Sequence, residues 1–87
     1  MIRILIADDH PFVRRGVTEV LTDEFPGVMI GEASTAPELL EQAGKHRWNV
    51  IVLDLTMPGR SGLDALHELK AGHPEIPVLV LSMHPED

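Results

Sequence analysis

Oxygen-bearing side chains stand at the ends of three apolar, strand-like runs of this sequence: Asp8, Asp9, Asp54 and Ser82. If these runs form neighbouring parallel strands, their carboxyl ends meet at one edge of a sheet and the side chains converge on one crevice. Two like charges ~4 Å apart repel by ~1 kcal/mol in water and ~4 kcal/mol at an effective dielectric constant near 20. Clustered carboxylates therefore need a counter-charge, and Mg²⁺ prefers a few carboxylates together with water and phosphate oxygens. The cluster predicts a divalent cation, for which Mg²⁺ is the natural candidate.

Each of these residues also has an ordinary structural explanation. Taken alone, Asp9 fits the cap of a following helix better than it fits a metal ligand. The segment 54–59 fits a turn whose geometry comes from its proline and glycine, and Ser82 alone is uninformative. An apolar strand seldom ends in a carboxylate without a partner, however, which sets Asp54 apart. The joint placement of these side chains at strand ends favours a site over coincidence.

The missing motifs narrow the chemistry further. Neither GxxxxGK[ST] nor GxGxxG follows the first apolar run, so a nucleotide- or flavin-binding domain, the second hypothesis, lacks its phosphate loop. No GxSxG elbow surrounds Ser82, which argues against a hydrolase nucleophile. The five histidines show no HxxxH spacing, so a zinc site is not expected. Only His10 and His84 lie next to the predicted crevice.

Four short apolar runs have the length of strands, and the segments between them have helical spacing. We expect strands over residues 2–7, 28–33, 50–55 and 78–81. Three helices are expected from apolar residues that share a face: Val13, Val17, Val20 and Leu21 in the first, Leu39, Leu40 and Ala43 in the second, and Leu63, Leu66 and Leu69 in the third.

Helix start and stop signals agree with these segments. Pro11 suits the first turn of a helix, where its missing N–H would be unpaired anyway. Thr35 and Ser61 fit N-caps followed by an acidic residue three positions on, and Gly72 ends the third helix. The resulting β-α-β-α-β-α-β order predicts an α/β, flavodoxin-like parallel sheet with helices on both faces and strand order 2-1-3-4.

Size and charge exclude several classes of protein. The 87 residues suffice for one domain. Fourteen acidic against seven basic side chains give a net charge of −7, which argues against nucleic-acid or anionic-membrane binding by this segment. There is no cysteine for a disulfide or a thiolate site. The first apolar run is too short for a signal sequence or a membrane span, so a cytoplasmic location fits.

Three motifs in register resemble a known family. They are Asp-Asp-His-Pro at 8–11, Leu-Asp-Leu-Thr-Met-Pro-Gly at 53–59 and Val-Leu-Ser-Met-His at 80–84. Together they look like the receiver domain of bacterial two-component response regulators, specifically the NarL/FixJ (LuxR-type) family. The resemblance extends along the whole chain in order and spacing. It implies a phosphorelay signalling domain rather than a metabolic enzyme, with a sensor histidine kinase as partner and a role in transcription for the full-length protein.

The resemblance also implies a role for each matching residue. Asp54 would accept the phosphoryl group from a phosphohistidine or a small phosphodonor. Asp9, Asp54 and the backbone carbonyl of Thr56 would ligate Mg²⁺, with Asp8 acting mainly through a bound water. Further roles fall to residues around the acceptor: Ser82 would donate its hydroxyl to a phosphoryl oxygen, Met57, Pro58 and Gly59 would shape the adjacent loop, and Thr56, Met57 and His84 would modulate the acyl phosphate.

The match stops at residue 87, where the family's fourth helix would begin. We therefore expect a single receiver domain over residues 1–87 that is incomplete at its C-terminus, without the family's strand-five lysine and aromatic residue and without a DNA-binding output domain. An uncovered strand 78–81 would then be an edge that pairs with another chain, which predicts self-association. The alternative function is a phosphorylation-independent interaction or dimerisation fragment with the same fold.

Overall fold

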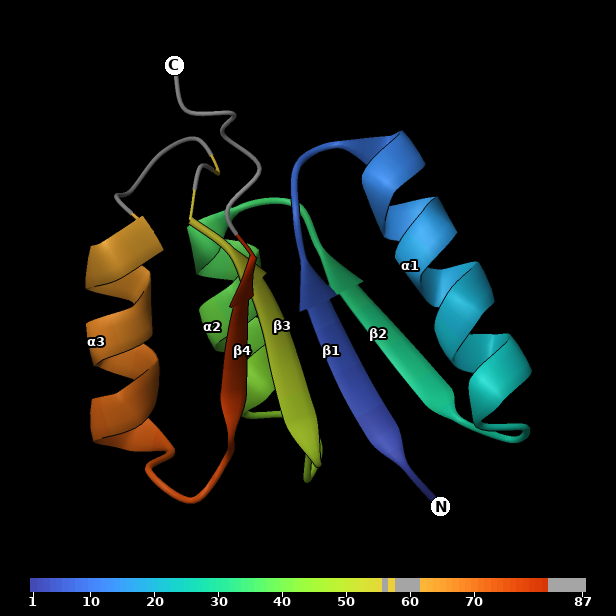
Figure 1. Ribbon diagram of the computed structural model, residues 1–87. Helices are drawn as coiled ribbons and strands as arrows, with labels where there is room; N and C mark the ends of the chain where they lie inside the picture. Colours follow the sequence, from blue (N-terminus) through green and yellow to red (C-terminus); the bar gives the residue numbers. More distant parts are fainter. Residues whose placement is uncertain (56, 58–61, 82–87) are drawn as a thin grey trace.

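The computed structural model describes residues 1–55, 57 and 62–81, in which strands and helices alternate along the chain (Figure 1). The elements are β1 (Arg3–Ala7), α1 (Pro11–Glu24), β2 (Met29–Ala33), α2 (Ala36–Ala43), β3 (Val50–Asp54), α3 (Gly62–Gly72) and β4 (Val78–Leu81). The predicted strands are all present, three of them one residue shorter than expected. The β-α-β-α-β-α-β order is confirmed.

The sheet is parallel throughout and has the order β2-β1-β3-β4. The predicted flavodoxin-like order 2-1-3-4 is therefore confirmed. In the pairing of β1 with β3, Ala7 lies opposite Leu53. The residues that follow, Asp8 and Asp54, are thereby brought to the same carboxyl edge.

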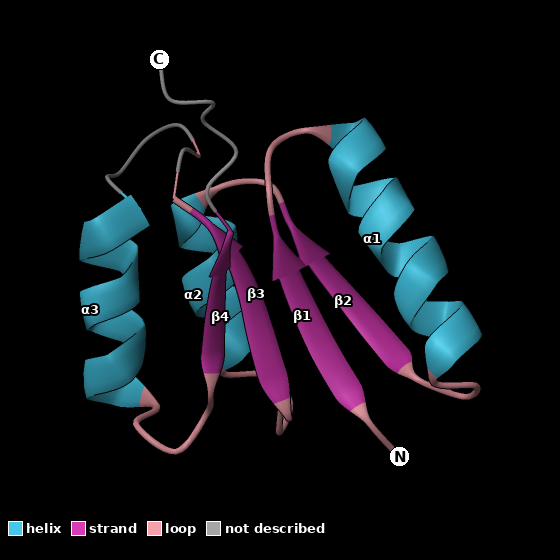
Figure 2. Cartoon of the chain, in the orientation of Figure 1, coloured by secondary structure: helices cyan, strands magenta, loops and turns pink. Residues whose placement is uncertain are grey.

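Helices cover both faces of the sheet (Figure 2). One core lies between the sheet and α2 with α3, and Leu5, Leu39 and Leu53 are fully buried in it. A smaller core lies on the opposite face, where Val17 and Leu21 of α1 pack against the strands. No helix within the described residues is long and apolar enough to cross a membrane.

Local signals set the ends of the helices largely as predicted. Pro11 begins α1, and Gly72 is the last residue of α3. Thr35 caps α2 by accepting a hydrogen bond from the backbone N–H of Glu38 at 3.2 Å. Glu38 reaches back, because its Oε1 accepts from the backbone N–H of Ser34 at 2.8 Å. This reciprocal pairing satisfies the N–H of Glu38 in the first turn and the N–H of Ser34 just before the cap. The predicted cap at 61 lies outside the described residues.

Two positions on the predicted helix faces are wrong. Val20 is 60% exposed and Leu63 is 53% exposed, although both were expected to face the core. Three residues of an α-helix turn through about 300°, so a spacing of three drifts by about 60° per step. The leucines of α3 follow that spacing: Leu69 is buried, Leu66 is partly buried against the core, and Leu63 is exposed. The buried face of α3 is formed instead by Gly62, Ala65 and Leu69.

Candidate functional site

Four side chains converge at the carboxyl edge of the sheet: Asp8, Asp9, His10 and Asp54. One ligand atom from each lies within 4.8 Å of the others. Asp54 ends β3, and the aspartates at 8 and 9 follow β1. The predicted convergence of carboxylates is confirmed, because neighbouring parallel strands end at one edge.

The carboxylates are withdrawn from water to an unusual degree. Asp54 is 0% exposed and Asp8 is 1% exposed, whereas the side chain of Asp9 is 29% exposed. Within the described part of the chain, Asp8 Oδ2 and Asp9 Oδ1 are buried oxygens without a hydrogen-bond partner. Buried carboxylate oxygens without donors are costly, so this edge is built for a positively charged or hydrogen-bonding occupant.

His10, when protonated, supplies part of the missing positive charge. Its Nδ1 lies 3.0 Å from Asp8 Oδ1, 3.0 Å from Asp9 Oδ1 and 3.7 Å from Asp54 Oδ2. The hydrogen bond to Asp8, and then the charge of Asp9, raise the pKa of the His10 imidazole above its ordinary value. His10 is also the N-cap residue of α1 and has no side-chain cap hydrogen bond. Asp9 therefore does not act as the N-cap that its sequence position suggested.

Arg14, which sequence reasoning missed, holds the end of β1 in place. Its Nη1 donates to the backbone carbonyl of Asp8 at 2.7 Å, and its Nε donates to Glu32 Oε1 at 2.8 Å. Because Glu32 lies in β2, one guanidinium joins α1 to the two strands. Arg14 is the fourth residue of α1 and so lies in the first turn beside the cluster, but no motif marked it.

The approach of α3 to the end of β3 depends on a glycine. A Cβ on Gly62 would lie 2.3 Å from the Cα and carbonyl oxygen of Leu55, which is far too close for backbone atoms. Gly62 thus lets the amino end of α3 pack against the residue after Asp54. Met57 is 4% exposed and belongs to the larger core. The predicted site residues Thr56, Ser82 and His84, with the loop residues 58 and 59, lie outside the described residues.

The oxygen-rich cluster suits a hard divalent cation. Three carboxylates provide the ligand type that Mg²⁺ takes from proteins, and two of their buried oxygens, Asp8 Oδ2 and Asp9 Oδ1, accept no hydrogen bond within the described residues. The set contains no sulfur, and its imidazole is engaged with Asp8. The donor chemistry of this edge therefore fits Mg²⁺ better than zinc.

Comparisons with known proteins agree with this geometry. Residues 4–87 match the family described as the response regulator receiver domain. The chain is 38% identical over 87 residues to the response regulator GacA of Pseudomonas viridiflava, covering 100% of this chain and 41% of that relative. The chain thus spans about two fifths of the length of the curated relative it matches.

Solved structures show the same fold. The response regulator protein TrrA of Thermotoga maritima in complex with Mg²⁺-BeF superimposes with a TM-score of 0.88 at 31% identity, covering 97% of this chain and 71% of that one. TrrA in complex with the histidine kinase ThkA gives a TM-score of 0.87 at 30% identity, covering 99% of this chain and 72% of that one. Both neighbours share the parallel sheet and helix arrangement described above.

Proposed function

Since the chain belongs to the family of response regulator receiver domains, we propose that Asp54 is the residue that accepts a phosphoryl group. The observation that carries the proposal is the placement of Asp54, fully buried at the end of β3 and within 4.8 Å of Asp8 and Asp9. A lone buried carboxylate could be structural. A carboxylate beside two others, at the edge where parallel strands end, has the setting of a phosphoryl-transfer site.

The proposed step converts the Asp54 carboxylate into an acyl phosphate. One carboxylate oxygen attacks the phosphorus of a phosphohistidine on a partner kinase, an O–P bond forms, and the N–P bond breaks with its electron pair leaving on the imidazole. Later attack by water returns inorganic phosphate and the free carboxylate. The domain would thus assist only its own phosphorylation and dephosphorylation, as a signalling switch.

The residues around Asp54 prepare it for this step. We propose that Asp9 and Asp54, with the backbone carbonyl of Thr56, hold Mg²⁺ directly and that Asp8 holds it mainly through water. When bound, Mg²⁺ supplies the positive charge that offsets the carboxylates and the phosphoryl oxygens. Asp8 is oriented by its hydrogen bond with His10 and by the contact of its backbone carbonyl with Arg14.

Other proposed roles fall on residues outside the described part of the chain. Ser82 would donate its hydroxyl to a phosphoryl oxygen, and Thr56 and His84 would tune the lifetime of the acyl phosphate. Met57, which is described and buried, would help to shape the loop and modulate the acyl phosphate. The proposed partner is a sensor histidine kinase, which is supported by the complex of TrrA with ThkA. For the full-length protein we propose cytoplasmic control of transcription, with no nucleic-acid or membrane contact by this acidic segment.

Intact-mass measurement after incubation with acetyl phosphate tests the proposal. Wild type with Mg²⁺ should gain the mass of one phosphoryl group, and the gain should disappear with EDTA or in Asp54→Asn. Asp23→Asn, which removes an exposed carboxylate from α1, is the matched control and should react like wild type. An adduct that persists in Asp54→Asn would show that another residue accepts the phosphoryl group. The absence of any adduct at saturating acetyl phosphate would contradict the proposed function.

A second candidate function is phosphorylation-independent self-association through strand Val78–Leu81. The observation in its favour is that β4 lies at the edge of the described sheet with Leu79 57% and Val80 37% exposed. An apolar edge strand offers N–H and carbonyl groups to another chain. Sedimentation over a range of concentrations should show an oligomer that Leu79→Lys disrupts. A monomer at the highest concentration would contradict this candidate.

A further inference from the structure

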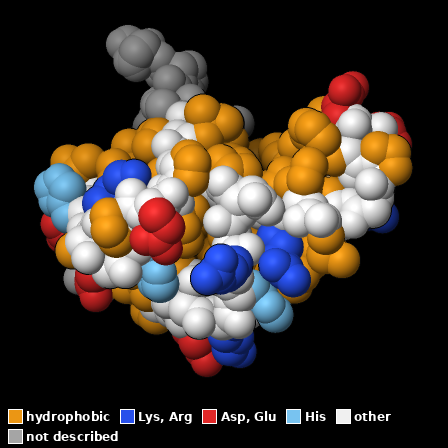
Figure 3. All heavy atoms as spheres, turned by 90° about the horizontal axis from the view of Figure 1, so that it is seen from below, with side chains coloured by type: hydrophobic (Ala, Val, Ile, Leu, Met, Phe, Trp, Pro, Cys, Tyr) orange, Lys and Arg blue, Asp and Glu red, His pale blue; other side chains and the backbone are white. Residues whose placement is uncertain are grey.

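A recess lies at the end of the sheet opposite Asp54. It has a volume of about 610 Å³, which is within the ~300–1,000 Å³ typical of small-molecule sites. The amino ends of β1, β3 and β4 border it together with the carboxyl ends of α2 and α3. Figure 3, which views this end of the molecule, shows Lys, Arg and His side chains gathered on it. The recess shares no residue with the carboxylate cluster.

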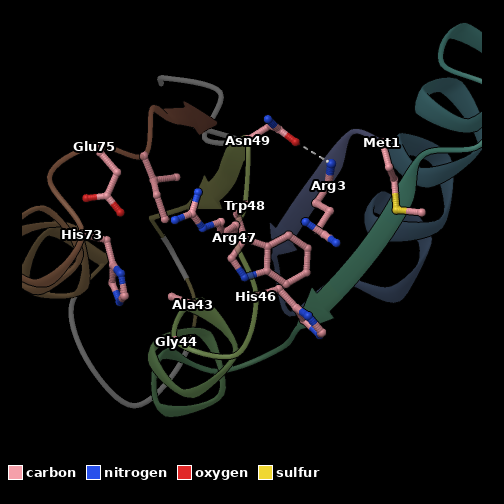
Figure 4. Close-up of a pocket in the computed structure, with 11 residues that line it drawn as sticks. Met1, Arg3, Ala43, Gly44, His46, Arg47, Trp48, Asn49, His73 and Glu75 are labelled. Atoms are coloured by element: carbon pink, nitrogen blue, oxygen red, sulfur yellow. Dashed lines mark hydrogen bonds between the residues drawn. The ribbon is translucent and has the colours of Figure 1, made fainter.

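The recess is lined by basic side chains around a tryptophan. Arg3, Arg47 and His46 are arranged around the indole of Trp48, with His73 and Glu75 on the facing wall (Figure 4). Two arginines against one glutamate leave a charge of +1 even with both histidines neutral. This local excess occurs in a chain whose net charge is −7. The charge of the side chains that line the recess is therefore opposite in sign to the net charge of the protein.

Neither arginine has an anionic partner within the described residues. Arg3 Nε is buried there without a hydrogen-bond acceptor, and neither guanidinium forms an ion pair with a described carboxylate. A buried guanidinium donor without an acceptor is costly. The side chains of Arg3 and Arg47 thus retain donors that an incoming oxyanion could use.

The carboxyl ends of the adjacent helices do not account for these arginines. Free carbonyls at a helix end attract cations, but within the described residues neither guanidinium donates a hydrogen bond to such a carbonyl, and two carbonyls at these ends have other donors. The backbone carbonyl of Gln42 accepts hydrogen bonds from the backbone N–H of Lys45 at 3.1 Å and from Trp48 Nε1 at 2.8 Å. The backbone carbonyl of Leu69 accepts a hydrogen bond from the backbone N–H of His73 at 2.7 Å. Arg3 and Arg47 therefore do not act as caps of α2 or α3.

We propose that this recess binds a small anion with two carboxylate or phosphate groups. Arginine presents a planar fork of donors that pairs with a carboxylate or phosphate in two parallel hydrogen bonds. Two such forks come from separate parts of the chain, one from β1 and one from the segment before β3. A ligand with two oxyanion groups can engage both of them.

Succinate and inorganic pyrophosphate are suitable probes, titrated without metal by calorimetry and by the emission of Trp48, the only tryptophan. At least one should bind saturably and shift the Trp48 indole N–H signal in an NMR spectrum, and acetate should bind more weakly. Preference for succinate or for pyrophosphate would assign the ligand to the carboxylate or the phosphate class. Because the recess is remote from Asp54, Asp54→Asn should bind the same probe with unchanged affinity.

Loss of one guanidinium should weaken binding at least about tenfold, since it removes charge-assisted hydrogen bonds. Arg3→Gln and Arg47→Gln are the test variants. Arg15→Gln is the control, because it removes an equal charge from an exposed position on α1. Arg47 is exposed outside the strands and helices, so its replacement should fold even if Arg3→Gln does not. No binding at millimolar probe, or equal binding by Arg47→Gln and wild type, would overturn the proposal.

Discussion

Replacing Asp54 by asparagine should increase the stability of the metal-free protein, although it removes the proposed acceptor. Asp54 and Asp8 are both almost completely buried, and the ligand atoms of their cluster lie within 4.8 Å of one another. At that separation two carboxylates repel by ~0.9 kcal/mol in water and ~3.5 kcal/mol at an effective dielectric constant of 20. Asparagine has the same shape without the charge. We expect the free energy of unfolding to rise by about 1–3 kcal/mol, less than the upper figure because Asp54→Asn also removes the attraction between Asp54 Oδ2 and His10 Nδ1, 3.7 Å away.

The gain in stability of Asp54→Asn over wild type should depend on pH because His10 titrates. The pKa of His10 is raised by Asp8 and then by Asp9, so the stabilisation from its imidazolium is fully present below its ordinary value of 6.5. That stabilisation is lost as pH rises through the folded-state pKa. The carboxylates then repel one another without this counter-charge. The difference between Asp54→Asn and wild type should therefore be larger at pH 9 than at pH 6.

Urea denaturation in EDTA, followed by the emission of the buried Trp48, measures this difference. Added Mg²⁺ should then stabilise wild type more than Asp54→Asn, because a ligand of the native state contributes RT ln(1 + [L]/Kd). The reasoning is refuted if Asp54→Asn is no more stable than wild type in EDTA. Equal stabilisation of both proteins by Mg²⁺ would separately exclude Asp54 from the metal site.

Three further predictions concern the elements that support the site. Gly62→Ala should lower the free energy of unfolding by about 1–3 kcal/mol through overpacking against the end of β3, while Gly72→Ala, with open space around it, should change it little in the same denaturation assay. Arg14→Gln should lower the free energy of unfolding by about 1–3 kcal/mol because it removes the charged hydrogen bonds of Arg14. Arg15→Gln removes only an exposed ion pair of 3.9 Å and should lower it by less than about 1 kcal/mol. Equal losses of stability in thermal melts would contradict the role of Arg14 in holding the end of β1. The backbone N–H of Ser34, and then its hydroxyl, lower the pKa of Glu38. The stabilisation that the Glu38 carboxylate provides is therefore fully present above the ordinary pKa of 4.5 and is lost as pH falls through the folded-state pKa. Glu38→Gln should make the free energy of unfolding less dependent on pH below about 4.5, which acid titration followed by circular dichroism would show.

The carboxylate site could be predicted from the sequence because it depends on topology rather than on packing detail. Apolar runs gave the strands, right-handed crossovers gave a parallel sheet, and the carboxyl ends of adjacent strands had to bring Asp8 and Asp54 together. Those steps require only the hydrophobic pattern and the order of elements. The predicted strand order is confirmed by the same reasoning.

Side-chain detail around the site could not be predicted in the same way. His10 was noted only as a neighbour of the crevice, yet its Nδ1 lies 3.0 Å from both Asp8 and Asp9. The contact of Arg14 with the backbone of Asp8 depends on where α1 crosses the sheet, which no local pattern encodes. The error at Leu63 arose because the buried face of α3 follows Gly62, Ala65 and Leu69 and not the leucine spacing.

The central position of β1 in the sheet also bears on how the protein folds. β1 pairs with β2, its next strand in the chain, and with β3, whose contacts join residues as far as 46 positions apart. The first pairing closes a shorter loop than the second and should form more easily. During synthesis, β1, α1 and β2 can therefore associate before Asp54 has been translated. The carboxylate of Asp54 comes close to those of Asp8 and Asp9 only when β3 pairs with β1, so their repulsion arises at that step. A divalent cation that binds the completed cluster would therefore favour the pairing of β3 with β1.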